Sequence, residues 1–217
     1  MLLYIIRHGD PDYEHNTVTA FGHKEAKALA DWFEEKQIRF DEIYVSPLGR
    51  AKDTAAYTCQ AQNIRPTELP WTAESMDYMQ PFPPASSVSF RFTANGVEDY
   101  TDFSEEDRMD SIQTLMMESD AFLKKAGYER IGSHYRCIRH NTKRIAVFCH
   151  GGFGTAWTAY LLGTAPTLGF SSMFMTTTSM NVFEFSPCGD SDFTRPRMLR
   201  FGDVPHLHRV DLADDRA

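Results

Sequence analysis

Cysteine is scarce in this sequence, and the cysteines present are far apart. There are four of them in 217 residues, with no CxxC pair and no histidine at a metal-ligand spacing: Cys59, Cys137, Cys149 and Cys188. Zinc sites use paired ligands and disulfide frameworks belong to short, cysteine-dense chains, so neither is expected here. Buried free thiols in a reducing compartment fit the pattern, and we expect a cytoplasmic protein.

Long apolar runs and an excess of basic residues are missing as well. No segment approaches the roughly 18 apolar residues of a membrane helix. The apolar N-terminal run is too short for a signal peptide and has no basic flank before it. A formal net charge of -8 argues against a binder of nucleic acids or acidic membranes, because both partners need an extended basic face. A small anionic ligand bound by a few arginines remains compatible with this charge.

The first third of the chain alternates between strand and helix patterns. Residues 2–6 form a continuous apolar run, which predicts a buried strand, and residues 23–37 carry apolar side chains at helical spacing. A second strand is predicted over 40–46 and a second helix over 47–63. This order is typical of an α/β fold, and we expect three layers, α/β/α, with a mostly parallel central sheet.

The same pattern returns after residue 143, within what we expect to be one domain over residues 1–217. Residues 143–149 predict an apolar strand and 155–163 a helix, and the last strands are expected over 180–186 and 195–201. With 42% hydrophobic and 24% charged residues, the composition suits a globular domain of this length.

Residues from about 75 to 135 interrupt the alternation and predict a helical, aromatic-rich insertion. Alternating apolar residues at Val88, Phe90 and Phe92, followed by the turn signal Asn95-Gly96, indicate a strand or hairpin. A helix is expected over 104–127, capped by Ser104 and ended by Gly127, and another over 128–140. The apolar stripe of the first of these helices is expected in the core: Met109, Ile112, Leu115, Met116 and Phe122.

Charged and glycine-rich motifs follow three of the predicted strands. The sequence reads Arg7-His8-Gly9 after the first, SPLGR (46–50) after the second and His150-Gly151-Gly152 after the late apolar strand. Because parallel strands end at the same sheet edge, two arginines and two histidines are expected to converge. Arginine forks and glycine-exposed N–H groups at a helix start bind phosphate, and a neutral histidine can attack phosphorus.

These motifs resemble those of the histidine phosphatase superfamily, also called phosphoglycerate mutase-like. The resemblance is carried by RHG, TAFG, SPLGRAKDTA and CHGG in this order, over residues 2–74 and 143–205. It implies that His8 is the nucleophile that becomes phosphorylated, and that Arg7, Arg50 and His150 surround the phosphate, with the Gly151 amide as a further donor. It implies no metal and no cofactor.

The resemblance also implies a carboxylic acid that protonates the leaving oxygen. Glu74 is the best match, and four other carboxylates stay open as alternatives: Glu68, Asp77, Glu98 and Asp99. Asn16 is a further candidate for phosphate contact, although it lies two positions beyond the asparagine of typical mutases. Asp10 follows RHG where many relatives carry Glu or Gln, so contacts in this loop are expected to differ.

The predicted function is therefore a metal-independent phosphomonoester hydrolase with a small phosphorylated substrate and inorganic phosphate as product. Two alternatives stay open: a phosphotransferase of the phosphoglycerate mutase type, and an inactive protein that binds phosphorylated ligands. The mutase interpretation is weakened because SMDYMQPFPPASS replaces the Gly-rich, Trp-containing segment that mutases have after the acidic residue. The insertion is expected to fold over the phosphate pocket and to set selectivity through Phe90 and Phe92.

Overall fold

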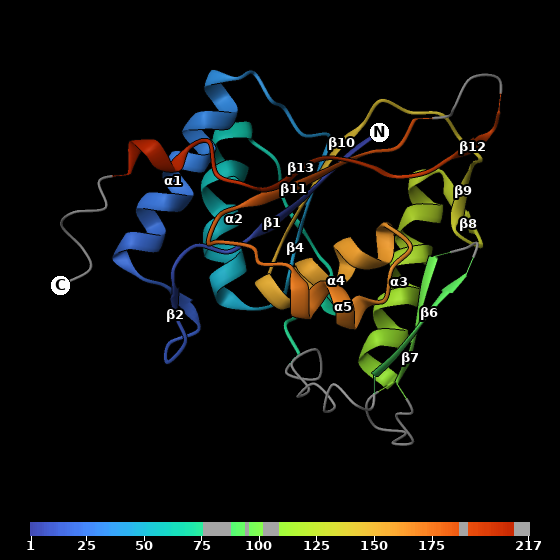
Figure 1. Ribbon diagram of the computed structural model, residues 1–217. Coiled ribbons are helices and arrows are strands. Elements are labelled where there is room, and N and C mark those ends of the chain that lie inside the picture. Colours follow the sequence, from blue (N-terminus) through green and yellow to red (C-terminus); the bar gives the residue numbers. More distant parts are fainter. Residues whose placement is uncertain (76–87, 94–95, 102–108, 187–190, 211–217) are drawn as a thin grey trace.

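A six-stranded mixed sheet forms the middle layer of the computed structural model (Figure 1). The structure describes residues 1–75, 88–93, 96–101, 109–186 and 191–210. In spatial order the strands are β13 (Arg197–Asp203), β11 (Met180–Glu184), β1 (Leu2–Arg7), β10 (Arg144–Cys149), β4 (Glu42–Val45) and β5 (Thr67–Glu68). Strands β1, β10, β4 and β5 are parallel, whereas β11 is antiparallel to both of its neighbours. The expected mostly parallel sheet is confirmed.

Helices cover both faces of the sheet. They are α1 (Ala20–Glu35), α2 (Gly49–Gln62), α3 (Met109–Ala126), α4 (Gly151–Leu161) and α5 (Pro166–Ser172). Successive β1 side chains point to opposite faces. Leu3 and Ile5 pack in one core with residues of α3 and α4, and Tyr4 and Ile6 pack in the other with residues of α1 and α2. The predicted three layers are confirmed, with α5 as a helix that the sequence patterns did not predict.

Two helices begin earlier than expected, for reasons local to their N-termini. Helix α1 begins at Ala20 because Thr19 caps it, accepting a hydrogen bond from the Gly22 N–H at 3.1 Å. Helix α4 begins at Gly151, directly after the N-cap residue His150. The glycine pair of the CHGG motif is therefore part of the helix, and the histidine of the motif stands at its start.

The helix predicted over 128–140 is wrong, because this segment is a hairpin. Strands β8 (Tyr128–Ile131) and β9 (His134–Cys137) pair antiparallel, and Gly132 turns the chain between them with a positive φ of 61°. Burial alternates along β9, with Tyr135 and Cys137 buried and their neighbours more exposed, as a strand requires. β12 (Phe193–Thr194) adds a third strand to this small sheet.

The rest of the 75–135 insertion combines a hairpin with a helix built into the core. β6 (Val88–Thr93) pairs antiparallel with β7 (Gly96–Thr101), which confirms the predicted hairpin. The turn at 94–95, the Ser104 cap and the side chains of Phe90 and Phe92 lie outside the described part of the structure, so their roles stay predictions. Helix α3 ends at Ala126, as expected before Gly127.

Helix α3 packs against α4, and this contact decides which of its residues are buried. Leu115 is fully buried and Phe122 packs against the same core. Ser119 accepts a hydrogen bond from the Trp157 indole N–H at 2.8 Å. Met116, predicted to lie in the core, is instead exposed. It directly follows the buried Leu115 and so lies beyond the apolar face of the helix.

The remaining elements are short. They are β2 (Pro11–Asp12), β3 (Thr17–Val18), the 3₁₀ helix η1 (Pro70–Thr72) and the 3₁₀ helix η5 (Leu207–Arg209). Cys59, Cys137 and Cys149 are buried and free, as predicted, and Cys188 lies outside the described residues. In the described part of the chain, no helix is long and apolar enough to cross a membrane.

Candidate active site

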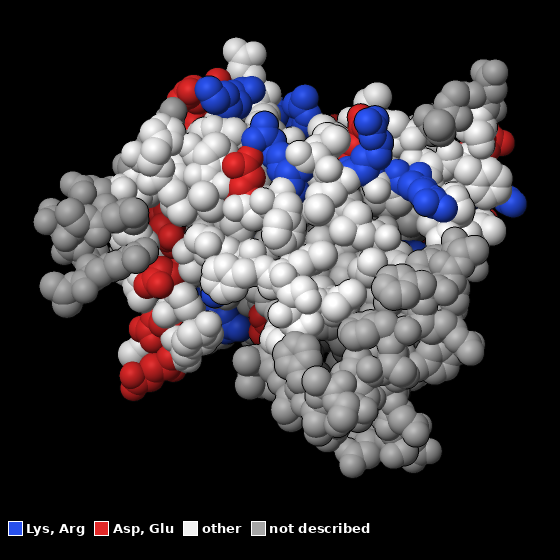
Figure 2. Space-filling model, in the orientation of Figure 1, with Lys and Arg blue, Asp and Glu red and all other residues white. Residues whose placement is uncertain are grey.

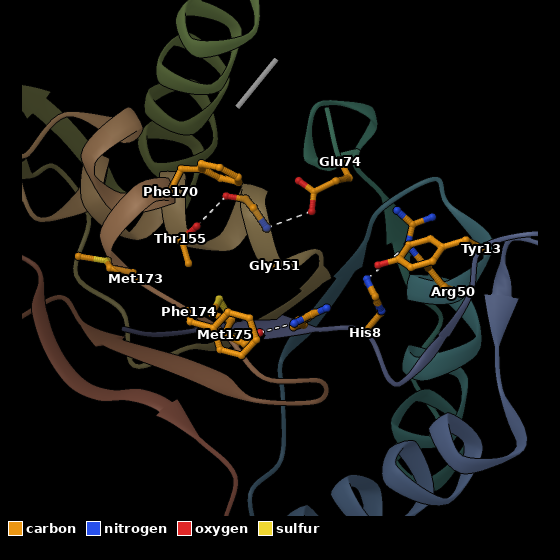
Figure 3. Close-up of a pocket in the computed structure, with 12 residues that line it drawn as sticks. His8, Tyr13, Arg50, Glu74, Gly151, Thr155, Phe170, Met173, Phe174 and Met175 are labelled. Carbon is orange, nitrogen blue, oxygen red and sulfur yellow. Dashed lines mark hydrogen bonds between the residues drawn. The ribbon is translucent and has the colours of Figure 1, made fainter. Parts of the chain in front are cut away.

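The carboxyl ends of β1, β4 and β10 meet at one edge of the sheet and open into a cavity of about 560 Å³ (Figure 3). Its lining residues are Arg7, His8, Tyr13, Arg50, Glu74, Gly151, Gly152, Thr155, Phe170, Met173, Phe174 and Met175. In Figure 3, His8, Arg50 and Tyr13 lie on one side of it, and Thr155, Phe170 and Phe174 on the other. The convergence predicted from the strand order therefore occurs.

His8 is buried and held in a defined protonation state. Its Nδ1 lies 2.7 Å from the Gly9 carbonyl oxygen. A carbonyl can only accept, so Nδ1 carries the proton and Nε2 keeps the lone pair. Burial, with the charges of Arg7 and Arg50, lowers the pKa of His8 to about 3. His8 is therefore a neutral imidazole with its lone pair on Nε2.

Helix α2 brings Arg50 to that nitrogen. The Arg50 Nε–H donates to His8 Nε2 at 3.3 Å, and Arg50 Nη1 donates to the Asn16 side-chain oxygen at 3.2 Å. Thr54, one turn along α2, accepts from the Gly9 N–H at 2.9 Å and donates to the Arg50 carbonyl at 2.7 Å. Thr54 of the SPLGRAKDTA motif thus connects the loop that contains His8 and Gly9 to helix α2, which carries Arg50.

Arg7 faces the same space from the end of β1. Its Nη1 donates to the Met175 carbonyl oxygen. Its Nε is buried and has no hydrogen-bond partner among the described residues. A buried donor without a partner is costly, so an arginine in this state is suited to an anionic oxygen in the cavity.

His150 lies fully buried behind His8, with the two ring centroids 5.2 Å apart. Ser46 Oγ and His150 Nε2 form a hydrogen bond of 2.7 Å. When the Ser46 hydroxyl is the donor, the imidazole proton is on Nδ1, an atom that has no partner in the described structure. Burial, followed by the neighbouring His8 and the charges of Arg50 and Arg7, lowers the pKa of His150 to about 2, so its imidazole is neutral.

Glu74 reaches the cavity from the segment after η1 and sits on the first turn of α4. Its Oε2 accepts the Gly152 N–H at 3.0 Å and its Oε1 accepts the Phe153 N–H at 2.8 Å. Burial raises the pKa of Glu74, although these two bonds and the two arginines act in the opposite direction. The helix N–H groups that were expected near phosphate are thus partly occupied by this carboxylate.

The alternative carboxylates differ in position from Glu74. Glu68 forms an exposed ion pair with Lys52 at 2.6 Å and does not line the cavity. Asp77 and the side chains of Glu98 and Asp99 lie outside the described residues. Glu74 is therefore the one candidate that the described structure places beside His8 and both arginines.

Two loop residues singled out in the sequence have structural roles. Asn16 adopts a positive φ of 52° and orients Arg50. Its carbonyl would lie 2.1 Å from a Cβ at position 49, so Gly49 is required there. Asp10 accepts a hydrogen bond from the Thr19 hydroxyl at 2.7 Å, at the start of α1, and is absent from the cavity lining.

Sequence reasoning missed the apolar part of the lining. Tyr13 and the residues around α5, namely Phe170, Met173 and Phe174, come from segments without a motif. The Arg50 guanidinium lies 5.4 Å from the Tyr13 ring centroid, and that of Arg7 lies 5.8 Å from the Phe174 centroid. Only the fold shows that these rings stand beside the two arginines.

Comparison with known proteins agrees with this geometry. The family model described as histidine phosphatase superfamily (branch 1) matches residues 3–79, which contain His8, both arginines and Glu74. Residues 3–79 are thus assigned to this superfamily, and the solved structures described below share the fold of nearly the whole chain. No curated protein matches the sequence. The superfamily resemblance inferred from RHG and SPLGRAKDTA is thereby confirmed, whereas CHGG lies outside the matched residues.

Solved structures of phosphatases share the fold at low sequence identity. A phosphoserine phosphatase from Entamoeba histolytica, in complex with 3-phosphoglyceric acid, has a TM-score of 0.63 at 20% identity, over 95% of this chain and 98% of that one. A mycobacterial glucosyl-3-phosphoglycerate phosphatase has a TM-score of 0.62 at 18% identity, over 93% and 98%. The alpha-ribazole phosphatase from Shigella flexneri has 0.59 at 16%, over 94% and 98%.

Both cationic side chains that line the described part of the cavity are arginines. In the described residues, no cluster of three or more His, Cys, Asp or Glu side chains could hold a metal ion. Among the residues that the structure describes, the charged side chains that line the cavity are Arg7, Arg50 and Glu74. Two guanidinium forks are suited to hold the oxygens of one phosphoryl group.

The missing side chain of Gly152 leaves room for the Glu74 carboxylate. Substitution of Gly152 is therefore the first test of the site. A Cβ at this position would meet Glu74 Oε1 at 2.8 Å and Phe170 Cε2 at 2.9 Å. We expect Gly152→Ala to displace the carboxylate and to lower kcat for alkyl phosphates by about 10- to 100-fold. Activity on p-nitrophenyl phosphate, whose leaving group needs no proton, should fall less. Equal losses on both esters would contradict this role of Gly152.

Proposed function

We propose that the protein hydrolyses small phosphomonoesters through a phosphohistidine formed at His8. The observation that carries the proposal is the state of this imidazole. Its proton is fixed on Nδ1 by the Gly9 carbonyl, its lone pair is on Nε2, and the Arg50 guanidinium contacts that nitrogen. This is the form of histidine that can attack phosphorus without prior loss of a proton.

In the first step, His8 Nε2 forms a bond to phosphorus while the ester P–O bond breaks. The leaving oxygen takes a proton from the Glu74 carboxylic acid, so the product is a neutral alcohol. Negative charge spreads over the three equatorial oxygens, where Arg7 and Arg50 supply positive charge and His150 Nδ1–H supplies a further donor.

In the second step, water replaces the histidine. The Glu74 carboxylate left by the first step takes a proton from the water, and the water oxygen bonds to phosphorus. The Nε2–P bond breaks, inorganic phosphate leaves, and Glu74 is again protonated. The two residues thus return to their starting states after each turnover.

The proposal is supported by the relatives as well as by the site. Solved relatives with the same fold are phosphatases named for phosphoserine, glucosyl-3-phosphoglycerate and alpha-ribazole. We extend to this chain their general activity on a small phosphorylated molecule. That the 75–135 insertion contributes to substrate choice, and that the protein is cytoplasmic, remain parts of the proposal.

Hydrolysis of p-nitrophenyl phosphate in the presence of EDTA tests the proposed function. We expect steady turnover that is unchanged by the chelator, because Arg7, Arg50 and His150 supply the charge and the donors. Activity that EDTA removes and a divalent metal restores would contradict the metal-independent mechanism. Two other outcomes would favour the alternatives: phosphoryl transfer to 3-phosphoglycerate with little hydrolysis indicates a mutase, and phosphate binding without turnover indicates an inactive binder.

A further inference from the structure

In the described lining of the cavity, the charged side chains lie near His8, and the most exposed side chains are uncharged. Its charged lining residues, Arg7, Arg50 and Glu74, lie close to His8. Farther out, the described lining consists mainly of aromatic and methionine side chains: Tyr13, Phe170, Met173 and Phe174. The surface over α4 and α5 in the same region is largely free of charged side chains, whereas lysines and arginines gather near β13 (Figure 2). The phosphoryl site and its approach therefore differ in chemistry.

Two aromatic rings at the mouth are strongly exposed. Tyr13 is 68% and Phe174 is 73% exposed, which are high values for large apolar side chains. A single exposed ring needs no explanation, but these two converge on one cavity from loops far apart in the sequence. Each lies beside one of the phosphate-facing arginines, at 5.4 Å for Tyr13 and 5.8 Å for Phe174. A phosphate held by both arginines would carry its ester group between these rings.

We infer that the natural substrate is a monophosphate whose leaving group is uncharged and apolar, with a ring or a branched hydrocarbon. This inference rests on the proposed function, because it assigns the phosphoryl group to the arginines. Once Arg7 and Arg50 hold the phosphate, the described lining has no further cation for a substrate carboxylate. Such a carboxylate would also lie near Glu74. A cavity of about 560 Å³ is large enough for a phosphate with a group of this size.

Binding of phosphonates tests the inference without requiring catalysis, because their P–C bond is not hydrolysed. Isothermal titration would compare three ligands of matched chain: propylphosphonate, 3-phenylpropylphosphonate and 3-phosphonopropanoate. We expect the phenyl compound to bind about 30-fold more tightly than the propyl compound, as burial of one ring predicts. The carboxylated compound should bind more weakly than the propyl compound.

Variants of the two rings show where the preference arises. In Tyr13→Ser/Phe174→Ser, the ratio of phenylpropyl to propyl affinity should fall to about threefold or less, and each single variant should lose part of it. Each ratio is internal to one variant, so a general loss of phosphonate affinity does not affect the comparison. Phe193→Ser, which changes an exposed ring outside the cavity, should keep the wild-type ratio.

The outcomes separate this inference from the proposed function. Equal binding of the phenyl and propyl compounds, or tighter binding of 3-phosphonopropanoate, would overturn the inference even if the protein is an active phosphatase. An unchanged ratio in the double variant would also overturn it. A missing turnover of phosphomonoesters, together with the expected binding ratios, would instead contradict the proposed function and leave the preference for apolar groups supported.

Discussion

His8→Ala is expected to lower the rate of phosphomonoester hydrolysis by about 10⁴-fold or more, because it removes the attacking nitrogen itself. The neighbouring groups do not replace it. The arginines carry no lone pair at working pH, and Nε2 of His150 is hydrogen-bonded to Ser46. The measurement is release of inorganic phosphate from p-nitrophenyl phosphate, followed for wild type and variant over the same pH range.

A control variant separates loss of the nucleophile from loss of the fold. His23 lies on α1, where its ring contacts the Tyr57 hydroxyl at 3.2 Å outside the cavity. His23→Ala should keep the wild-type rate to within about twofold, since surface substitutions rarely matter more. Circular dichroism should show the same helix content in all three proteins. If His8→Ala keeps a tenth of the wild-type rate, the nucleophile lies elsewhere.

The second large effect is expected for Glu74→Gln on esters with a basic leaving group. An alkyl phosphate releases an alkoxide that needs a proton, so its kcat should fall by about 10²- to 10³-fold. p-Nitrophenolate leaves without a proton, so the rate of phosphoryl transfer from p-nitrophenyl phosphate to His8 should change far less. The amide also replaces one of the two acceptors for the Gly152 and Phe153 N–H groups. Proton transfer is therefore measured by the ratio of two losses in kcat, the loss on an alkyl phosphate divided by the loss on p-nitrophenyl phosphate.

The pH profile gives an independent signature of the same residue. Burial raises the pKa of Glu74, so its acid form persists to higher pH than that of a free glutamate, and is lost as the pH rises through that value. The pKa of His8, at about 3, sets the lower limit, because protonated His8 has no lone pair. We expect kcat/KM for alkyl phosphates to be highest between these two ionisations and to lose its basic limb in Glu74→Gln.

Glu68→Gln serves as the matched control for this prediction. It changes a carboxylate that is close to Glu74 in the sequence but exposed. This carboxylate forms an ion pair with Lys52 and does not line the cavity. Its activity should equal that of wild type on both kinds of ester. If Glu74→Gln instead affects both esters equally and keeps the basic limb, the acid must be sought among Asp77, Glu98 and Asp99.

The parts of the site that could be predicted are those that follow buried strands. Apolar runs identify β1, β4 and β10, and the residues after them must lie at one sheet edge, so the amino-acid sequence alone groups Arg7, His8 and Arg50. His150 joins them for the same reason. Local periodicity and chain order were sufficient here because each motif is contiguous.

Other features depend on contacts between distant segments and could not be predicted. The position of Glu74 depends on Gly152, 78 residues away, whose missing side chain leaves room for the carboxylate. Tyr13 and Phe174 come from loops with no periodic pattern, so only the fold shows that they face the same cavity. The helix expected over 128–140 was a wrong prediction. Short apolar segments are compatible with the period of a helix or of a strand, and here the turn at Gly132 gives a hairpin.

The most direct test of the proposed mechanism is to quench the protein while it is mixed with substrate and to look for a phosphoryl group on His8. Wild-type protein would be mixed with an excess of phosphomonoester, quenched with alkali within milliseconds and digested, since phosphohistidine survives alkali but not acid. We predict one phosphoryl group on the peptide that contains His8, formed at least as fast as steady-state turnover and absent from His8→Ala. Turnover without a phosphorylated protein, or a phosphoryl group on another residue, would contradict the mechanism.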